Sequence, residues 1–373
     1  MKGLVRIVVI IIIFLFTVPV SLVTEQRESE TPSSLGGFQF YQDDNIWNVP
    51  VDSLPVESHS SAYIDADYLG VTGSDLHMAI AEDFPINIVN QSTPRQYLTS
   101  FAPDLEVFSD DIAYPIPENA IVEEGSDKGM LMVDKDANML YELYVANQND
   151  DGTWEAACGV AFNLSRYELR PDGWPSTSAS GLPIAPGLIR YDEVEAGSIN
   201  HALHINLPTT GYAHIWPARS GGVQKSPSYP PLGQRFRLKE SFDISGFNPS
   251  QKVILTALKK YGVILTDNEG PAQYFSLGAV NDERWGSEIG FRAFQSVHFS
   301  DFEAVDVSSL IIDEDSGQAR IPPSSMPTPL PNEFLSDDNP GNFHLRNYLP
   351  TLCNSYFVHW FNSIYTGDIF NPC

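Results

Sequence analysis

Closely spaced turn residues are the feature that most constrains the fold of this chain. Its 373 residues include 28 prolines and 26 glycines, which favour turns over long regular segments. The apolar runs between turns are short and suit pleated, partly buried strands. Examples are residues 130–133, 140–145, 201–207 and 213–216. This pattern predicts a mainly β chain that forms a β-sandwich or a jelly-roll-like domain.

Residues 249–261 form the one prominent segment with a helical pattern. Their apolar side chains recur at helical spacing, Asn248 precedes them and Gly262 follows them. Lys259 and Lys260 stand in the last turn, where positive charge interacts favourably with the helix dipole. The sequence therefore predicts one prominent α-helix, packed on the sheet.

The composition excludes two broad classes of protein. Hydrophobic residues make up 42% of the chain and charged residues 18%, so the chain can build a core and is not disordered throughout. Acidic residues outnumber basic ones by 48 to 21, which gives a net charge of −27. Such a surface repels phosphate backbones and excludes nucleic acid as a partner. Most of these carboxylates are expected to be solvated.

Residues 1–24 have the layout of an export signal. Lys2 and Arg6 precede an uninterrupted apolar run at 7–16, and apolar residues continue to Val23. This is the pattern of a secretory signal peptide, and its length also suits an N-terminal membrane anchor. Both alternatives place the protein outside the cytoplasm, either secreted or anchored. The membrane is then contacted only through this segment.

Composition also divides the rest of the chain. A polar spacer at 25–37 leads into the main β-rich domain, 38–321. The segment 322–331 is a Pro-rich linker that favours an extended conformation. The aromatic C-terminal tail, 332–373, is too short to build a core of its own.

The three cysteines predict one disulfide and one inert thiol. In an oxidising compartment Cys353 and Cys373 would pair and close the tail, whereas Cys158 lies in an apolar, strand-like run and is expected to be buried. No sequence pattern for a structural metal site is present. Residues 147–152 resemble a calcium loop, but a hairpin loop explains them better. No cofactor is therefore predicted, and Ca²⁺ is only a weak candidate.

Several blocks between Asn45 and about Asp306 occur together in a fixed order. They are Asn-Ile-Trp-Asn at 45–48, Leu-Tyr-Glu-Leu-Tyr at 140–144, the block at 180–194 that begins Ser-Gly-Leu-Pro, His-Ala-Leu at 201–203, Trp-Pro-Ala-Arg at 216–219, the block at 230–239, Ala-Leu-Lys-Lys-Tyr-Gly at 257–262, and Asp-Asn at 267–268. With these blocks the chain resembles a family of secreted, largely uncharacterised microbial proteins. The resemblance implies one coherent exported domain and supplies no reaction.

The chain departs from that family at two positions. Relatives tend to carry a histidine after the pair that matches Asp127-Lys128, and another after the Trp-Pro-Ala-Arg block. Here these positions are Gly129 and Ser220. If those histidines are catalytic in the family, this chain lacks that chemistry, although His201 remains.

Three residues are candidates for acid–base catalysis. His201 lies in an apolar segment, where its pKa is easily moved towards neutrality, although a buried structural histidine is the commoner case. Glu142 stands inside an aromatic strand and is either buried, with a raised pKa, or turned to water. Asp267 follows a predicted strand and lies either at the rim of a site or in a simple turn.

Four further residues are candidates for substrate binding. Arg219 and Arg237 could clamp a carboxylate or an acidic sugar, or could pair with the abundant acids of the chain itself. Trp216 could stack on a sugar ring or belong to the core. Asp127 lies in a loop and could be either a rim residue or a turn residue.

These observations support two hypotheses. The first is an exported protein that binds or processes extracellular polysaccharide through the residues above. The second is a non-catalytic protein of the cell envelope, or an adhesion protein, whose partner is an envelope component. Whether the chain is an enzyme stays open, because motifs of serine hydrolases and nucleotide-binding loops are absent from the sequence.

Overall fold

The computed structural model describes residues 35–286 and 289–323. Strands make up 28% and helices 13%, so the prediction of a mainly β chain is confirmed. The predicted export segment, most of the Pro-rich linker, the aromatic tail and the pair Cys353 and Cys373 lie outside these ranges. Among the described helices, none is long and apolar enough to cross a membrane.

The larger sheet has six strands in the order β18-β15-β16-β12-β17-β3. Its strands are β3 (His77–Phe84), β12 (Leu203–Leu207), β15 (Arg235–Leu238), β16 (Val263–Asn268), β17 (Tyr274–Val280) and β18 (Phe302–Val305). The pairs β12/β16 and β17/β3 are parallel, and the other neighbours are antiparallel. This sheet is therefore mixed.

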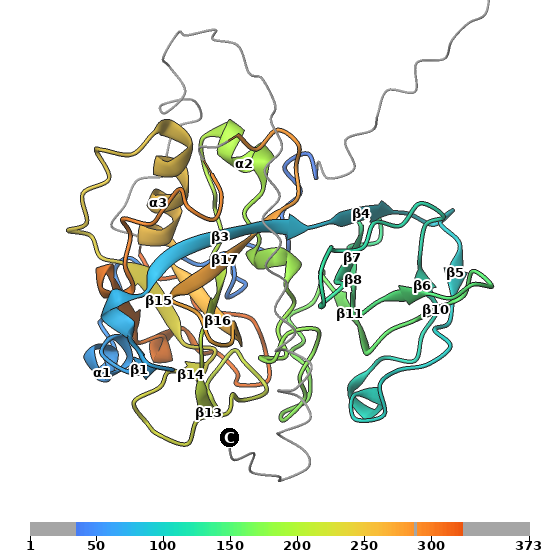
Figure 1. Ribbon diagram of the computed structural model, residues 1–373, viewed down its shortest axis with the longest axis horizontal. Coiled ribbons are helices and arrows are strands. Elements are labelled where there is room, and N and C mark those ends of the chain that lie inside the picture. The colour runs from blue at the N-terminus through green and yellow to red at the C-terminus, as the bar shows by residue number, and fades with distance from the viewer. Residues whose placement is uncertain (1–34, 287–288, 324–373) are drawn as a thin grey trace, which may run out of the picture. The chain divides into compact units, whose positions relative to one another are not determined.

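A second sheet has four strands in the order β11-β8-β7-β4. Its strands are β4 (Ile86–Val89), β7 (Met130–Asp134), β8 (Met139–Tyr144) and β11 (Cys158–Asn163). The pair β4/β7 is parallel and the other pairs are antiparallel. Figure 1 shows β3 leading directly into β4, so that one chain segment supplies a strand to each sheet.

The remaining elements are short, apart from one helix. The other strands are β1 (Asp67–Tyr68), β2 (Val71–Thr72), β5 (Arg95–Gln96), β6 (Tyr114–Pro115), β9 (Asn147–Gln148), β10 (Trp154–Glu155), β13 (Gly211–His214) and β14 (Pro231–Leu232). The α-helices are α1 (Ser60–Ile64), α2 (Tyr191–Ala196) and α3 (Pro249–Lys260). Short 3₁₀ helices occur at Gly73–Asp75, Glu106–Phe108, Ala185–Gly187, Phe299–Asp301 and Ser308–Leu310.

The finer expectation of a sandwich or jelly roll is not met, because neither is identified among the described residues. Those folds are built from antiparallel strands, whereas both larger sheets here contain parallel pairs. A parallel pair needs a long crossover connection, and the chain between β12 and β16 includes α3. Alternating apolar residues identify a strand but do not reveal its direction in the sheet.

The predictions of the helix, the hairpin loop and the buried cysteine are confirmed. The helix predicted at 249–261 is α3, and Asn248 forms a capping box with Gln251 at its start. Gly262 follows it with φ +64°, a conformation that glycine adopts without strain. The segment 147–152 is a hairpin loop that begins with β9 and leads to β10, as predicted. Cys158 is buried, and burial raises the pKa of its thiol to about 11.

Two predicted strands were misplaced by two residues. The strand expected at 201–207 begins at Leu203, so His201 precedes it. The strand expected at 213–216 spans Gly211–His214, and the Trp216–Pro217 peptide bond that follows is cis. Apolar residues lie just before Leu203 and just after His214, which is why the sequence pattern extended the strands past these two ends.

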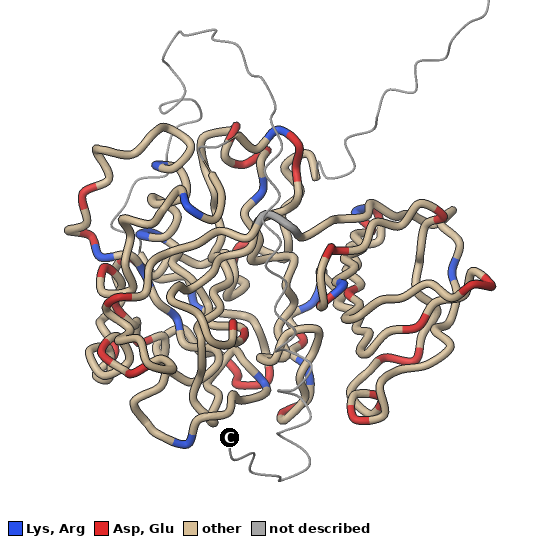
Figure 2. The backbone as a smooth tube through the Cα atoms, in the orientation of Figure 1, with Lys and Arg blue, Asp and Glu red and all other residues tan. Residues whose placement is uncertain are grey.

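Figure 2 shows that Lys and Arg are sparser along the backbone than Asp and Glu. One of these arginines, Arg235, is fully buried. Arg235 donates to the carbonyl oxygens of Tyr261 at 2.8 Å, Ile46 at 2.9 Å and Val49 at 3.2 Å. Burial lowers the pKa of its guanidinium to about 9. Arg237, two residues along the same strand, donates to the carbonyl oxygens of Val51 and Leu54. The two arginines thus fix the segment 46–54 to the six-stranded sheet.

Arg235→Lys is expected to destabilise the protein by about 2–4 kcal/mol. A lysine keeps a buried charge, but its single ammonium group cannot reach three carbonyl oxygens held around a planar guanidinium. Urea unfolding followed by fluorescence measures the change. Arg166→Lys is the matched control, because the Arg166 side chain is 63% exposed and its variant should match the wild type. Equal stability of the two variants would contradict this account of Arg235.

Candidate functional site

Two of the predicted catalytic carboxylates bind one short segment of the chain. Glu142 lies on β8 of the four-stranded sheet, and Asp267 lies near the end of β16 in the six-stranded sheet. The Thr177 hydroxyl donates to Glu142 Oε2 at 2.5 Å, and the Ala179 backbone N–H donates to Asp267 Oδ2 at 2.9 Å. We call residues 176–185 the bridging segment, because it joins a carboxylate from each sheet.

Glu142 is fully buried, so the interpretation that turned it to water was wrong. All residues of β8 from Leu140 to Tyr144 are buried, which leaves this strand no solvent face. The backbone N–H groups of Ile184 and Ala185 donate to Glu142 Oε1 at 2.9 and 3.0 Å. Burial raises the pKa of Glu142 to about 7, although these hydrogen bonds oppose the rise. Both carboxylate oxygens are thus occupied by the bridging segment.

Asp267 is 7% exposed, and its pKa is raised as that of Glu142 is. Its Oδ1 accepts the Asn268 backbone N–H at 2.7 Å. Burial raises the pKa of Asp267 to about 7, and the negative charges of Asp127 and Glu269 contribute to the rise. Burial also raises the pKa of Tyr144, and Asp127 and Asp267 add to that effect. The negative charge of Asp127 therefore acts on both Asp267 and Tyr144.

The bridging segment contains a cluster of hydroxyl groups that sequence reasoning missed. Ser176 and Ser178 both donate to the carbonyl oxygen of Leu182, at 2.7 and 2.9 Å, and the hydroxyls of Ser178 and Ser180 lie 2.9 Å apart. All of these serines are buried. The available signal was the run Ser-Thr-Ser-Ala-Ser at 176–180, which combines small and hydroxyl side chains next to a block shared with the resembled family.

Asp267 lies where α/β proteins commonly place their ligands. β12 and β16 are parallel neighbours, so their carboxyl ends, Leu207 and Asn268, meet at the same edge of the sheet. Ligands bind preferentially beyond such ends. At this edge the Thr210 hydroxyl donates to Asn268 Oδ1 at 2.7 Å.

His201 forms a separate buried cluster. Its Nε2 lies 3.1 Å from Glu193 Oε2, and its Nδ1 lies 2.8 Å from the carbonyl oxygen of Ala202. Both partners can only accept, so the two bonds form together only when both ring nitrogens carry hydrogen. Burial would raise the pKa of Glu193, but the charges of Arg190 and His201 hold it below its ordinary value. Neither ring nitrogen of His201 bonds Glu142 or Asp267, and Glu193 was not foreseen from the sequence.

The predicted substrate-binding arginines donate to the protein itself. Arg219 donates to the carbonyl oxygens of Arg170 at 2.7 Å and Glu314 at 2.9 Å, and pairs with Asp315 at 2.6 Å. Arg237 pairs with Glu303, with a hydrogen bond of 2.8 Å from its Nε. These contacts match the alternative in which arginines pair within the chain.

Trp216 is 8% exposed and donates from Nε1 to the carbonyl oxygen of Ser316 at 2.8 Å. Its buried position matches the alternative in which it belongs to the core. Within the part of the chain that the structure describes, no group of three or more His, Cys, Asp or Glu side chains is placed to hold a metal ion.

Glu142→Gln should remove a pH dependence from the stability of the fold. The pKa of Glu142 is near 4.5 in the unfolded chain and about 7 in the folded protein. The folded state therefore binds more protons between these values, and the stability that Glu142 contributes is lost as the pH rises from about 4.5 to 7. Across this pH window the free energy of unfolding of the wild type should fall by on the order of 3 kcal/mol relative to that of Glu142→Gln.

Urea unfolding at a series of pH values measures this difference. Glu168→Gln is the control, because the Glu168 side chain is 69% exposed. A difference between the wild type and Glu142→Gln that stays constant with pH would refute the raised pKa.

Comparison with known proteins does not assign a family to this chain. No family model, no curated protein and no solved structure matches it. The inference of function therefore rests on the sequence features above and on the geometry of the bridging segment and the carboxylates that it joins.

Proposed function

We propose that this chain is an exported protein that binds and processes extracellular polysaccharide by acid–base catalysis. The observation that carries the proposal is the position of Asp267. This carboxyl has a pKa of about 7, which burial and the negative charge of Asp127 raise, and it stands at the carboxyl ends of two parallel strands. A pair of acidic groups with separated protonation states is the usual machinery for breaking glycosidic bonds.

The residues have different roles in this proposal. Asp267 is the proton donor, because its pKa of about 7 leaves a large share of this carboxyl protonated at neutral pH and a small part of the residue reaches solvent. Asp127 supplies the negative charge that favours the protonated form of Asp267. Glu142 has no exposed surface, so it acts as a positioning residue that fixes the bridging segment behind Asp267.

Polysaccharide is the favoured substrate class for three reasons. The sequence at 1–24 has the pattern of an export signal, and polysaccharides are abundant outside the cytoplasm. The resembled family is secreted. The net charge of −27 excludes nucleic acids as the alternative extended polymer.

A non-catalytic role in the cell envelope or in adhesion is the second candidate. It is favoured by how completely three of the predicted site residues, Glu142, His201 and Arg219, are bonded within the chain. Both oxygens of Glu142 and both ring nitrogens of His201 have partners, and Arg219 donates to backbone and to Asp315. The residues Gly129 and Ser220, which replace histidines of the resembled family, point the same way.

Asp267→Asn is expected to lower the rate of polysaccharide cleavage by about 100-fold or more, since a general acid contributes that much. The wild-type rate should fall as the pH rises through about 7, because only the protonated carboxyl can donate. Release of reducing ends from a panel of neutral and acidic polysaccharides, with the full chain, measures both effects. Asp150→Asn, in the exposed hairpin loop, is the control.

Thermal unfolding of the same proteins separates the two candidates. A polysaccharide that binds only the folded state raises the unfolding midpoint. A rise without cleavage would support the non-catalytic role. If no polysaccharide of the panel raises the unfolding midpoint and none is cleaved, the proposed function is refuted.

A further inference from the structure

Two segments of the chain carry the pattern that marks an asparagine for attachment of a glycan. The pattern is Asn-x-Ser or Asn-x-Thr, where x is any residue except proline. It occurs at 90–92 and at 163–165, whereas the third Asn-x-Ser, at 248–250, has proline in the middle and does not fit. An attached glycan is bulky and hydrophilic, so it needs an asparagine whose side chain reaches solvent. The two matching segments differ in this respect.

Asn90 stands in an exposed turn. It follows β4 directly, and Asn90, Gln91 and Ser92 are all exposed. The side-chain oxygen Oδ1 of Asn90 accepts the Ser92 hydroxyl at 2.6 Å and the Ser92 backbone N–H at 2.8 Å. The side-chain nitrogen Nδ2 of Asn90 forms no hydrogen bond with the described residues. Asn90 therefore offers solvent the atom to which a glycan is attached.

The two hydrogen bonds to Asn90 Oδ1 suit the chemistry of attachment. An amide nitrogen is a weak nucleophile, because its lone pair is shared with the carbonyl group, and it reacts more readily once it has lost a proton. Donors to Oδ1 stabilise the negative charge that develops there as Nδ2 loses its proton. The turn is formed by adjacent residues, so it can form before the rest of the chain has folded.

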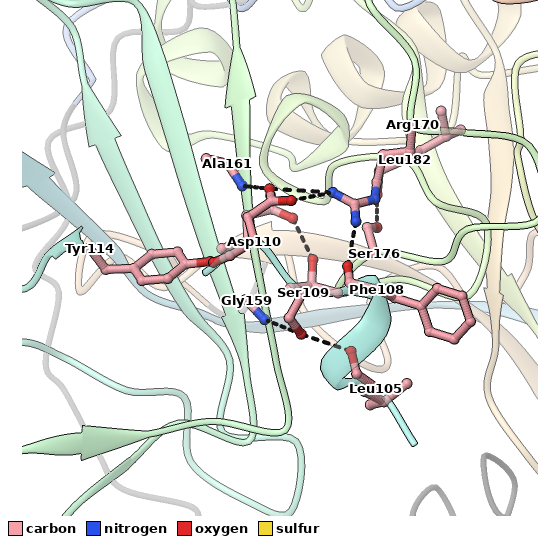
Figure 3. Close-up of polar contacts among 12 residues, drawn as sticks. Leu105, Phe108, Ser109, Asp110, Tyr114, Gly159, Ala161, Arg170, Ser176 and Leu182 are labelled. Carbon is pink, nitrogen blue, oxygen red and sulfur yellow. Dashed lines mark hydrogen bonds and ion pairs between the residues drawn. The ribbon is translucent and has the colours of Figure 1, made fainter. Parts of the chain in front are cut away.

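Asn163 stands in more crowded surroundings. It is the last residue of β11, where it pairs with Met139 of β8, and the middle residue of its pattern, Leu164, is only 3% exposed. Figure 3 shows the same strand fastened by a second segment, through the Ala161 backbone N–H that donates to Asp110 Oδ2 at 2.9 Å. An enzyme that draws Asn163 into its own site must break these contacts. Because β8 and β11 are close in sequence, their pairing withdraws Asn163 early.

We propose that Asn90 carries an N-linked glycan and that Asn163 is left unmodified. In the reaction, Nδ2 of Asn90 loses a proton and forms a bond to C1 of a sugar. The bond between that C1 and a phosphate oxygen of a lipid-linked sugar donor breaks, and the lipid phosphate leaves with its electron pair. A membrane-bound glycosyltransferase of the export pathway supplies the donor. The proposal rests on the export predicted from residues 1–24 and is independent of the chemistry at Asp267.

Peptide mass spectrometry of the full chain, isolated from the medium and envelope of its own cells, tests the proposal. The peptide that contains Asn90 should carry the added mass of a glycan, and the peptide that contains Asn163 should have its unmodified mass. Ser92→Ala should abolish the added mass because it removes the hydroxyl, whereas Ser92→Thr should retain it. Asn163→Gln is the matched control and should leave the glycan on Asn90. An exported chain with unmodified Asn90, or with a glycan on Asn163 alone, overturns the proposal.

The polysaccharide assays separate this inference from the proposed function. Asn90→Gln should lose the glycan and still release reducing ends at the wild-type rate, because Asn90 takes no part in the chemistry at Asp267. A glycan on Asn90 in a chain that neither binds nor cleaves polysaccharide supports the modification and overturns only the proposed function. Cleavage by an exported chain without the glycan does the reverse. A chain found only in the cytoplasm, without a glycan, contradicts both.

Discussion

The hydrogen bonds of the Glu142 carboxylate are the interaction on which the described structure depends most. They anchor the bridging segment to β8 through the Thr177 hydroxyl and the backbone at 184 and 185. The same segment is bonded by Asp267 from the other sheet. A buried carboxylate without these donors would cost several kcal/mol. Glu142 therefore fixes the segment that supports the proposed proton donor.

Much of the local structure could be predicted from the sequence. The helix α3, the hairpin at 147–152 and the buried Cys158 are each determined by residues adjacent in the chain. The parallel pairings could not be predicted in this way, because they join strands such as β3 and β17 that are far apart in sequence. Strand patterns record which residues are apolar, whereas pairing depends on contacts between distant segments.

The candidate site was only partly foreseeable for the same reason. Glu142, Asp267 and Asp127 stood out as charges beside apolar strands, and the charge of Asp127 raises the pKa of Asp267. The sequence did not reveal that Glu142 binds a serine-rich segment, or that Arg219 donates to carbonyl oxygens of distant loops. An arginine's donors can be satisfied by any backbone carbonyl, and no residue type marks that partner.

The placement of β3 has a consequence for how the chain is made. This strand is an edge strand whose partner in the sheet, β17, is synthesised only after most of the described residues. Until then β3 presents unsatisfied backbone groups and apolar side chains, which invite association with other chains. The β4 strand that continues it can pair earlier, with β7. A nascent chain would thus complete the smaller sheet while the larger one still awaits its closing strands, and a holding chaperone would have most to protect at β3.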